Sequence, residues 1–157
     1  MGYLRINNEL VPVDFKTKTL TKDSVYSLVK HGGHGHRKTT PTQVIWHWDA
    51  ALSADSCHRI LKRRRISSHG IIDNDGTFIQ LLDFAKHTAW HAGNSKVNKA
   101  SIGIDVSNAV YLKYQSYYTE RWGSRPEISA TIRGHKYDLL GYYPAQITTA
   151  KALASAI

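Results

Sequence analysis

Apolar and polar positions alternate over residues 44–49, and this pattern predicts a strand with two different faces. One face carries Val44, Trp46 and Trp48. The opposite face carries Ile45, His47 and Asp49. A histidine at the end of an apolar strand is a candidate metal ligand, although a histidine that bonds to a backbone carbonyl would give the same pattern.

Two more strands are expected at residues 69–73 and 77–82, because the sequence at 74–76, Asn-Asp-Gly, is typical of a tight hairpin turn. A further strand is predicted over residues 101–106. Its apolar face consists of Ile102, Ile104 and Val106. Its other face consists of Ser101, Gly103 and Asp105, and the glycine leaves room for a ligand beside the carboxylate.

Residues 53–64 and 145–157 are predicted to form helices, with Ser53 as the cap of the first and Pro144 at the start of the second. The order strand, helix, hairpin, strand, helix predicts an α/β fold, a single domain with a mixed central β-sheet flanked by helices. Within the first helix, Cys57 and its neighbour His58 point about 100° apart and do not form a nucleophilic pair. We therefore expect a structural cysteine.

We expect the domain to span residues 1–157, with a β-rich extension at 1–40 and the core at 41–157, which ends inside the C-terminal helix. The segment 31–38 reads HGGHGHRK. It is either a metal-binding tract or, because of its glycines, a mobile loop. Residues 109–143 are rich in tyrosine and are expected to form a long irregular insertion over the sheet.

The chain has 157 residues, of which 41% are hydrophobic, and this is enough for one core. No apolar run approaches the roughly 18 residues that a membrane span needs. Residues 1–10 lack the order of a signal peptide, so a protein of this sequence that acts outside the cytoplasm would need another route of release. A single cysteine excludes an intrachain disulfide.

The formal net charge is +9, which favours polyanionic partners. The densest basic run consists of Arg59 and residues 62–65. This run is either a solvated helix end, where cations are favoured, or a surface for an anionic bacterial wall. Because no nucleic-acid-binding motif is present, nucleic acid is the less favoured partner.

Four segments follow one another in a characteristic order. They are residues 44–49 (VIWHWD), 67–80 (SSHGIIDNDGTFIQ), 89–93 (AWHAG) and 101–108 (SIGIDVSN). As a set they resemble the zinc-dependent N-acetylmuramoyl-L-alanine amidases, the type-2 family that includes phage lysins and peptidoglycan-recognition proteins. The resemblance implies hydrolysis of the bond between N-acetylmuramic acid and L-alanine in peptidoglycan, by a phage lysin. Such a lysin is expected to be made in the host cytoplasm and to act on the bacterial cell wall after release. A domain that binds peptidoglycan without cleaving it is the alternative.

The resemblance also implies roles for single residues. His47 is expected to be a Zn²⁺ ligand, and Asp105, which stands where the family has glutamate, is expected to be the general base. His69 is expected to line the catalytic pocket and to bond to the scissile carbonyl or to the attacking water. For both His69 and Asp105, a structural role in the strand is the alternative.

Trp90, His91 and Asn108 are expected to bind the substrate, with the indole packed on a sugar; packing in the core is the alternative for Trp90. In the family, the second and third zinc ligands follow the C-terminal helix, so we expect them beyond Ile157. His135 precedes that helix and does not match a ligand by position.

Overall fold

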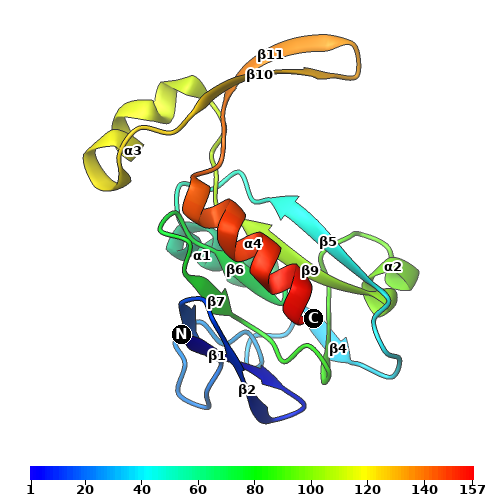
Figure 1. Ribbon diagram of the computed structural model, residues 1–157. Helices are drawn as coiled ribbons and strands as arrows, with labels where there is room; N and C mark the ends of the chain where they lie inside the picture. Colours follow the sequence, from blue (N-terminus) through cyan, green and yellow to red (C-terminus); the bar gives the residue numbers. More distant parts are fainter.

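A five-stranded mixed sheet lies at the centre of the computed structural model, which describes all residues from 1 to 157 (Figure 1). Its strand order is β3–β7–β6–β9–β5. The bounds are Thr17–Lys18 for β3, Gln43–Trp48 for β5, Gly70–Ile72 for β6, Phe78–Gln80 for β7 and Ser101–Val106 for β9. Strands β5, β9 and β6 run parallel, whereas β6 and β7 form the antiparallel hairpin that Gly76 permits with its φ of 80°.

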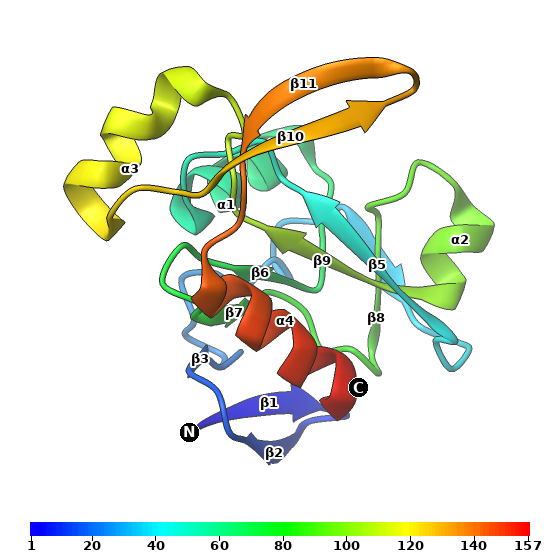
Figure 2. The same cartoon turned by 45° about the horizontal axis from the view of Figure 1, so that its top comes forward.

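One face of the sheet packs against helix α4, Pro144–Ala156, and against the N-terminal hairpin of β1, Gly2–Ile6, and β2, Glu9–Val13. Figure 2 shows β1 beside the C-terminal end of α4. The buried residues of this side are Leu4, Phe15, Ile72, Phe78, Phe84, Ile102, Ile104, Val106 and Leu153. The three alternate apolar residues predicted for the strand 101–106 all belong to this group, which is why that strand has one apolar face.

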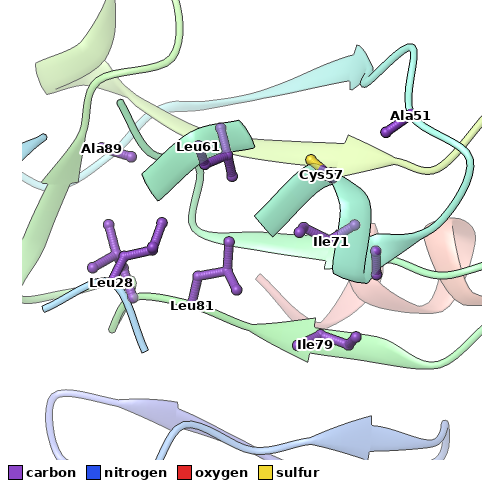
Figure 3. Packing of buried hydrophobic residues seen from close by; sticks show 10 residues of the cluster. Leu28, Ala51, Cys57, Leu61, Ile71, Ile79, Leu81 and Ala89 are labelled. Atoms are coloured by element: carbon purple, nitrogen blue, oxygen red, sulfur yellow. The ribbon is translucent and has the colours of Figure 1, made fainter. Parts of the chain in front are cut away.

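The opposite face of the sheet packs against helix α1, Ala54–Arg64. Figure 3 shows Cys57 and Leu61 of this helix above Ile71 and Ile79 of the sheet. Ser53 caps the helix, and its hydroxyl oxygen accepts a hydrogen bond from the Ser56 N–H. Two layers of helix around a mixed sheet confirm the predicted α/β fold class. The predicted division of the chain at residue 40 stays a prediction.

The histidine-rich segment contains a strand, contrary to the mobile-loop alternative. His34–His36 forms strand β4, which pairs antiparallel with β8, His87–Ala89. The expectation was wrong because the glycines do not prevent pairing: Gly35 lies opposite Thr88, and its flanking residues complete the two-stranded ribbon. Strand β4 thus ties the N-terminal extension to the core.

The insertion at 109–143 is also more regular than expected. It contains a 3₁₀ turn at Leu112–Tyr114, helix α3 at Gln115–Trp122, and a hairpin of β10, Glu127–Ile132, and β11, His135–Leu140. Arg133 and Gly134 connect the two strands with φ values of 52° and 82°, the left-handed turn that matches the twist of a hairpin. Figures 1 and 2 show the hairpin projecting away from the sheet.

One short helix was absent from the sequence-based expectation. Helix α2, Ser95–Ala100, is capped by Asn94, whose side-chain oxygen accepts hydrogen bonds from the Lys96 and Val97 amides. It leads directly into β9. None of the helices has the length and apolar character that a membrane crossing requires.

Candidate active site

The pairing of β5 with β9 brings His47 and Asp105 side by side. In this parallel register His47 lies opposite Asp105, so both side chains are on the sheet face that α1 covers. A pocket of about 170 Å³ opens between this face and the helix. It is lined by His47, Trp48, Asp49, Cys57, Ile60, Leu61, Arg64, Ile66, Ser67, His91 and Asp105. Three residues expected to act in one site, His47, His91 and Asp105, are therefore in one pocket.

A chain of hydrogen bonds fixes the two histidines of the pocket. Ser101 donates its hydroxyl hydrogen to the Val97 carbonyl at 2.7 Å, so its oxygen accepts from His91 Nε2–H at 3.0 Å. His91 Nδ1 is then unprotonated and accepts a hydrogen bond from His47 Nε2–H at 2.8 Å. In this tautomer the free lone pair of His47 is on Nδ1, the atom available to a metal ion.

Gly103 allows the His91 ring to lie against the sheet. A Cβ built on this glycine would be 2.4 Å from Cγ of His91, far closer than real contacts. The room that the sequence suggested for a ligand beside Asp105 is therefore filled by the imidazole of His91. Burial lowers the pKa of both histidines, and that of His91 falls to about 4 with help from the neighbouring His47. Both rings are neutral at pH 7.

Two carboxyl groups lie in the same pocket, that of the buried Asp105 and that of the half-buried Asp49. Burial raises the pKa of Asp105 to about 6, although the Ser68 and Cys57 side chains hydrogen-bond to it and act in the opposite direction. Burial likewise raises the pKa of Asp49 to about 6. Its carboxylate accepts hydrogen bonds from the amides of Ala51 and Asn108 and from the Ser107 hydroxyl.

Asp49 and Arg64 line the pocket, although the sequence did not mark either of them as a site residue. A signal for Asp49 was present, because the alternation over 44–49 already placed it on the face of His47. For Arg64 the basic run at the end of the helix gave no such signal. Its contribution to the pocket depends on how α1 lies on the sheet.

Cys57 is structural, as expected. It is 4% exposed and packs in the cluster between α1 and the sheet (Figure 3). Burial, with the carboxyl groups of Asp105 and Asp49 beside it, strongly raises the pKa of its thiol. A thiol that resists ionisation is a hydrogen-bond donor to its neighbours and is unsuited to nucleophilic attack.

The structure does not bring His69 to the pocket. Its ring is fully buried, and both nitrogens are used within the protein. Nδ1 accepts a hydrogen bond from the Gly103 amide at 3.0 Å, and Nε2 donates to the His87 carbonyl at 3.0 Å. A neutral ring is required for this arrangement, and burial lowers the pKa of His69 to about 3. His69 therefore lies where a structural strand histidine would lie, which was the alternative to a place in the catalytic pocket.

Asn108 is likewise turned into the protein. It is 1% exposed, its amide donates to the Leu140 carbonyl at 2.8 Å, and its side-chain oxygen accepts from the Val110 amide at 2.9 Å. These contacts attach the end of the β10–β11 hairpin to the sheet. The structure thus corrects the expectation that this side chain faces a substrate.

Trp90 and His135 also lie outside the pocket. Trp90 is 48% exposed, so the alternative that it packs in the core is wrong. Together with His36 and Asn98 it borders a neighbouring hollow. His135 is exposed at the start of β11 and does not line the pocket of His47.

The family model of the N-acetylmuramoyl-L-alanine amidases, Amidase_2, matches residues 37–157, which is well over half of the chain. The chain belongs to this amidase family. No curated protein gives a significant match.

A solved amidase structure shares the fold. The amidase AmiD of E. coli, in complex with the substrate anhydro-N-acetylmuramic acid-L-Ala-D-γ-Glu-L-Lys, is similar with a TM-score of 0.52 and 23% identity over 75% of this chain. AmpD, as a selenomethionine derivative, has a TM-score of 0.47 and 21% identity over 79% of this chain and 68% of its own. This amidase-family chain spans 43% of the AmiD chain.

The pocket of His47 does not by itself form a complete zinc site. Catalytic zinc sites generally have three protein ligands and an open position. Among residues 1–157, no group of three or more histidine, cysteine, aspartate or glutamate side chains is arranged to hold a metal ion. His47 offers one imidazole nitrogen, and its nearest imidazole partner, His91, is already engaged on both ring nitrogens.

Proposed function

We propose that this chain hydrolyses the amide between N-acetylmuramic acid and L-alanine in peptidoglycan. The observation that carries the proposal is the placement of His47 opposite Asp105 in one pocket of an amidase-family chain. Membership in the amidase family indicates which bond is cut. The pocket places the buried Asp105 carboxylate beside the imidazole of His47, which a hydrogen bond to His91 holds in place.

In the proposed reaction, the ionised Asp105 accepts a proton from a water molecule that attacks the amide carbonyl carbon. A carbon–oxygen bond forms, the carbon–nitrogen bond breaks, and the proton passes to the nitrogen of the leaving L-alanine. The side chains of Ser68 and Cys57 lie beside this carboxylate. Water is the only co-reactant.

A peptidoglycan-binding module without catalysis is the second candidate, favoured by the lack of a three-ligand metal group. The two are separated by incubating the protein with purified walls and measuring new amino termini of L-alanine. We expect such termini to appear with time and in proportion to protein concentration. Walls that are bound but release no new amino termini would support the binding module.

We further propose that the activity uses Zn²⁺ and that His47 is one of its ligands. Replacing His47 by alanine is then expected to reduce both the zinc content of the purified protein and the release of L-alanine termini. Zinc per chain is measured by elemental analysis. His135→Ala serves as the control, because that histidine is exposed on β11 and lies outside the pocket. Equal zinc and equal activity in His47→Ala and wild type would remove His47 from the metal site.

The proposed biological setting is a phage lysin that is made in the host cytoplasm and reaches the wall after release. A basic protein suits this role because bacterial walls carry anionic groups. The net charge is +9, and Arg59, Arg63 and Arg65 of the basic run are exposed around the end of α1.

Binding to purified walls is expected to weaken as salt rises, since exposed charges are screened over about 8 Å at physiological ionic strength. Co-sedimentation with walls at increasing sodium chloride measures this. A variant with Arg59, Arg63 and Arg65 all changed to glutamine should bind more weakly at low salt and respond less to added salt. Salt-independent sedimentation of the wild type would contradict a charge-driven association.

A further inference from the structure

Three histidines share one face of the β4–β8 ribbon, outside the pocket of His47. His34 and His36 are two residues apart in strand β4, so their side chains are on the same side. His87 lies directly opposite His36 in the antiparallel register, which places it on that side as well. Two histidines at this spacing in one strand and a third on its neighbour are an arrangement that can present three imidazoles to one ion.

Two of these rings carry a buried nitrogen without a partner. His34 Nε2 lies 3.1 Å from the Val29 carbonyl oxygen and must donate to it, so the lone pair of the neutral ring is on Nδ1. That Nδ1 is buried and has no hydrogen-bond partner, and the same is true of Nδ1 of His87. Buried polar atoms are nearly always paired, so two unpaired nitrogens on adjacent rings need a common explanation.

The separation of the two rings suits a shared metal ion. The centroids of His34 and His87 are 5.1 Å apart, with the ring planes at 89°. Two imidazoles bound at about 2.0–2.1 Å to one tetrahedral zinc ion have ring centres roughly 5 Å apart. The three rings do not converge on one point in the structure, so His36, which is exposed, must turn about its side-chain bonds to become the third ligand.

The surroundings of the histidines favour a metal that binds neutral nitrogen ligands. Burial and the neighbouring His34 lower the pKa of His87, so this ring is unprotonated at neutral pH. Four basic and two acidic residues border the same hollow as His87, and this excess of positive charge opposes any cation held by charge alone; they are Arg5, Lys22, Lys30, Lys86, Asp23 and Asp83. Imidazole ligands select Zn²⁺, Cu²⁺, Ni²⁺ or Co²⁺ over Mg²⁺ and Ca²⁺.

We propose that His34, His36 and His87 form a second metal site, for a divalent transition-metal ion such as zinc, separate from the pocket of His47. The bound ion fastens β4 of the N-terminal extension to β8. Strand β8 continues into the segment of Trp90, and His36 and Trp90 border one hollow. The ion therefore stabilises the extension and the wall of that hollow.

The site is tested in the full chain carrying His47→Ala, so that the proposed catalytic site makes no contribution. Titration with Co²⁺ is expected to give about one equivalent bound, with the visible absorption of nitrogen-ligated cobalt. Adding His36→Ala should weaken binding at least about tenfold, since even residues that only support a metal ligand are worth 10- to 100-fold in affinity. His36 is exposed, so this change leaves the fold intact.

His31→Ala is the matched control, because His31 belongs to the same histidine-rich segment but precedes β4. It should bind cobalt as the parent does. Zinc should also raise the melting temperature of the parent and of His31→Ala, but not that of His36→Ala or His87→Ala. The proposal is overturned if the parent binds no cobalt, or if His36→Ala and His87→Ala bind it as tightly as the parent. Neither result depends on whether the chain is an active amidase.

Discussion

Replacing Asp105 by asparagine is expected to lower the rate of L-alanine release by about 10²–10⁴-fold, the usual contribution of a general base. The substitution keeps the shape and volume of the side chain but removes its ability to accept a proton. The carboxylate is 8% exposed and lies opposite His47 in the β5–β9 register, so no other group of β9 can replace it at that place. Initial rates on purified peptidoglycan measure the loss.

Asp14→Asn is the control for this variant, since Asp14 is exposed in the N-terminal extension and does not border the pocket. It should cleave walls at the wild-type rate. Normal activity of Asp105→Asn would make Asp105 a structural residue. Loss of zinc from that variant would make it a metal ligand or a support for one, and Asp49, on the same sheet face, would then be the next candidate base.

Replacing Arg125 by alanine is expected to reduce the free energy of unfolding by about 3–5 kcal/mol, the size typical of removing a large buried side chain whose hydrogen-bond acceptors then lack donors. The side chain is 2% exposed, and its guanidinium carbon lies 4.2 and 4.3 Å from the ring centroids of Tyr118 and Tyr143. Its terminal nitrogens donate hydrogen bonds to the carbonyls of Ser107 and Gly141 and to the side chains of Asn74 and Gln146. Removing it leaves these buried acceptors unpaired and opens a cavity.

Urea unfolding of Arg125→Ala and of Arg121→Ala separates this network from a general effect of lost charge. Arg121 lies 3.9 Å from the ring centroid of Tyr117 on α3, but it is exposed, and its polar contacts are with the Tyr117 carbonyl and the neighbouring Glu120 on the same helix. We expect its loss to change stability by less than about 1 kcal/mol. Similar stabilities of the two variants would mean that Arg125 does not anchor the insertion to the core.

The sequence by itself determined the central elements of this protein and the family to which it belongs. The period of two over 44–49 and 101–106 identified both strands and the face on which His47 and Asp105 lie, because alternate residues of a strand always point to the same side. The turn at Asn74-Asp75-Gly76 and the cap at Ser53 marked the ends of elements, since their backbone requirements are local. Local signals of this kind need no knowledge of distant residues.

Tertiary structure alone decided which polar side chains face the pocket. His69 and Asn108 belong to the same characteristic segments as the pocket residues, yet both are turned inward and bonded to Gly103, His87, Leu140 and Val110. Residue type and spacing cannot reveal this, because the partners come from strands and loops far away in the chain. The contact of His47 with His91 likewise depends on the β8–α2 segment lying over Gly103. Burial and pairing are properties of all the packed elements together, whereas the strand pattern is a property of each strand alone.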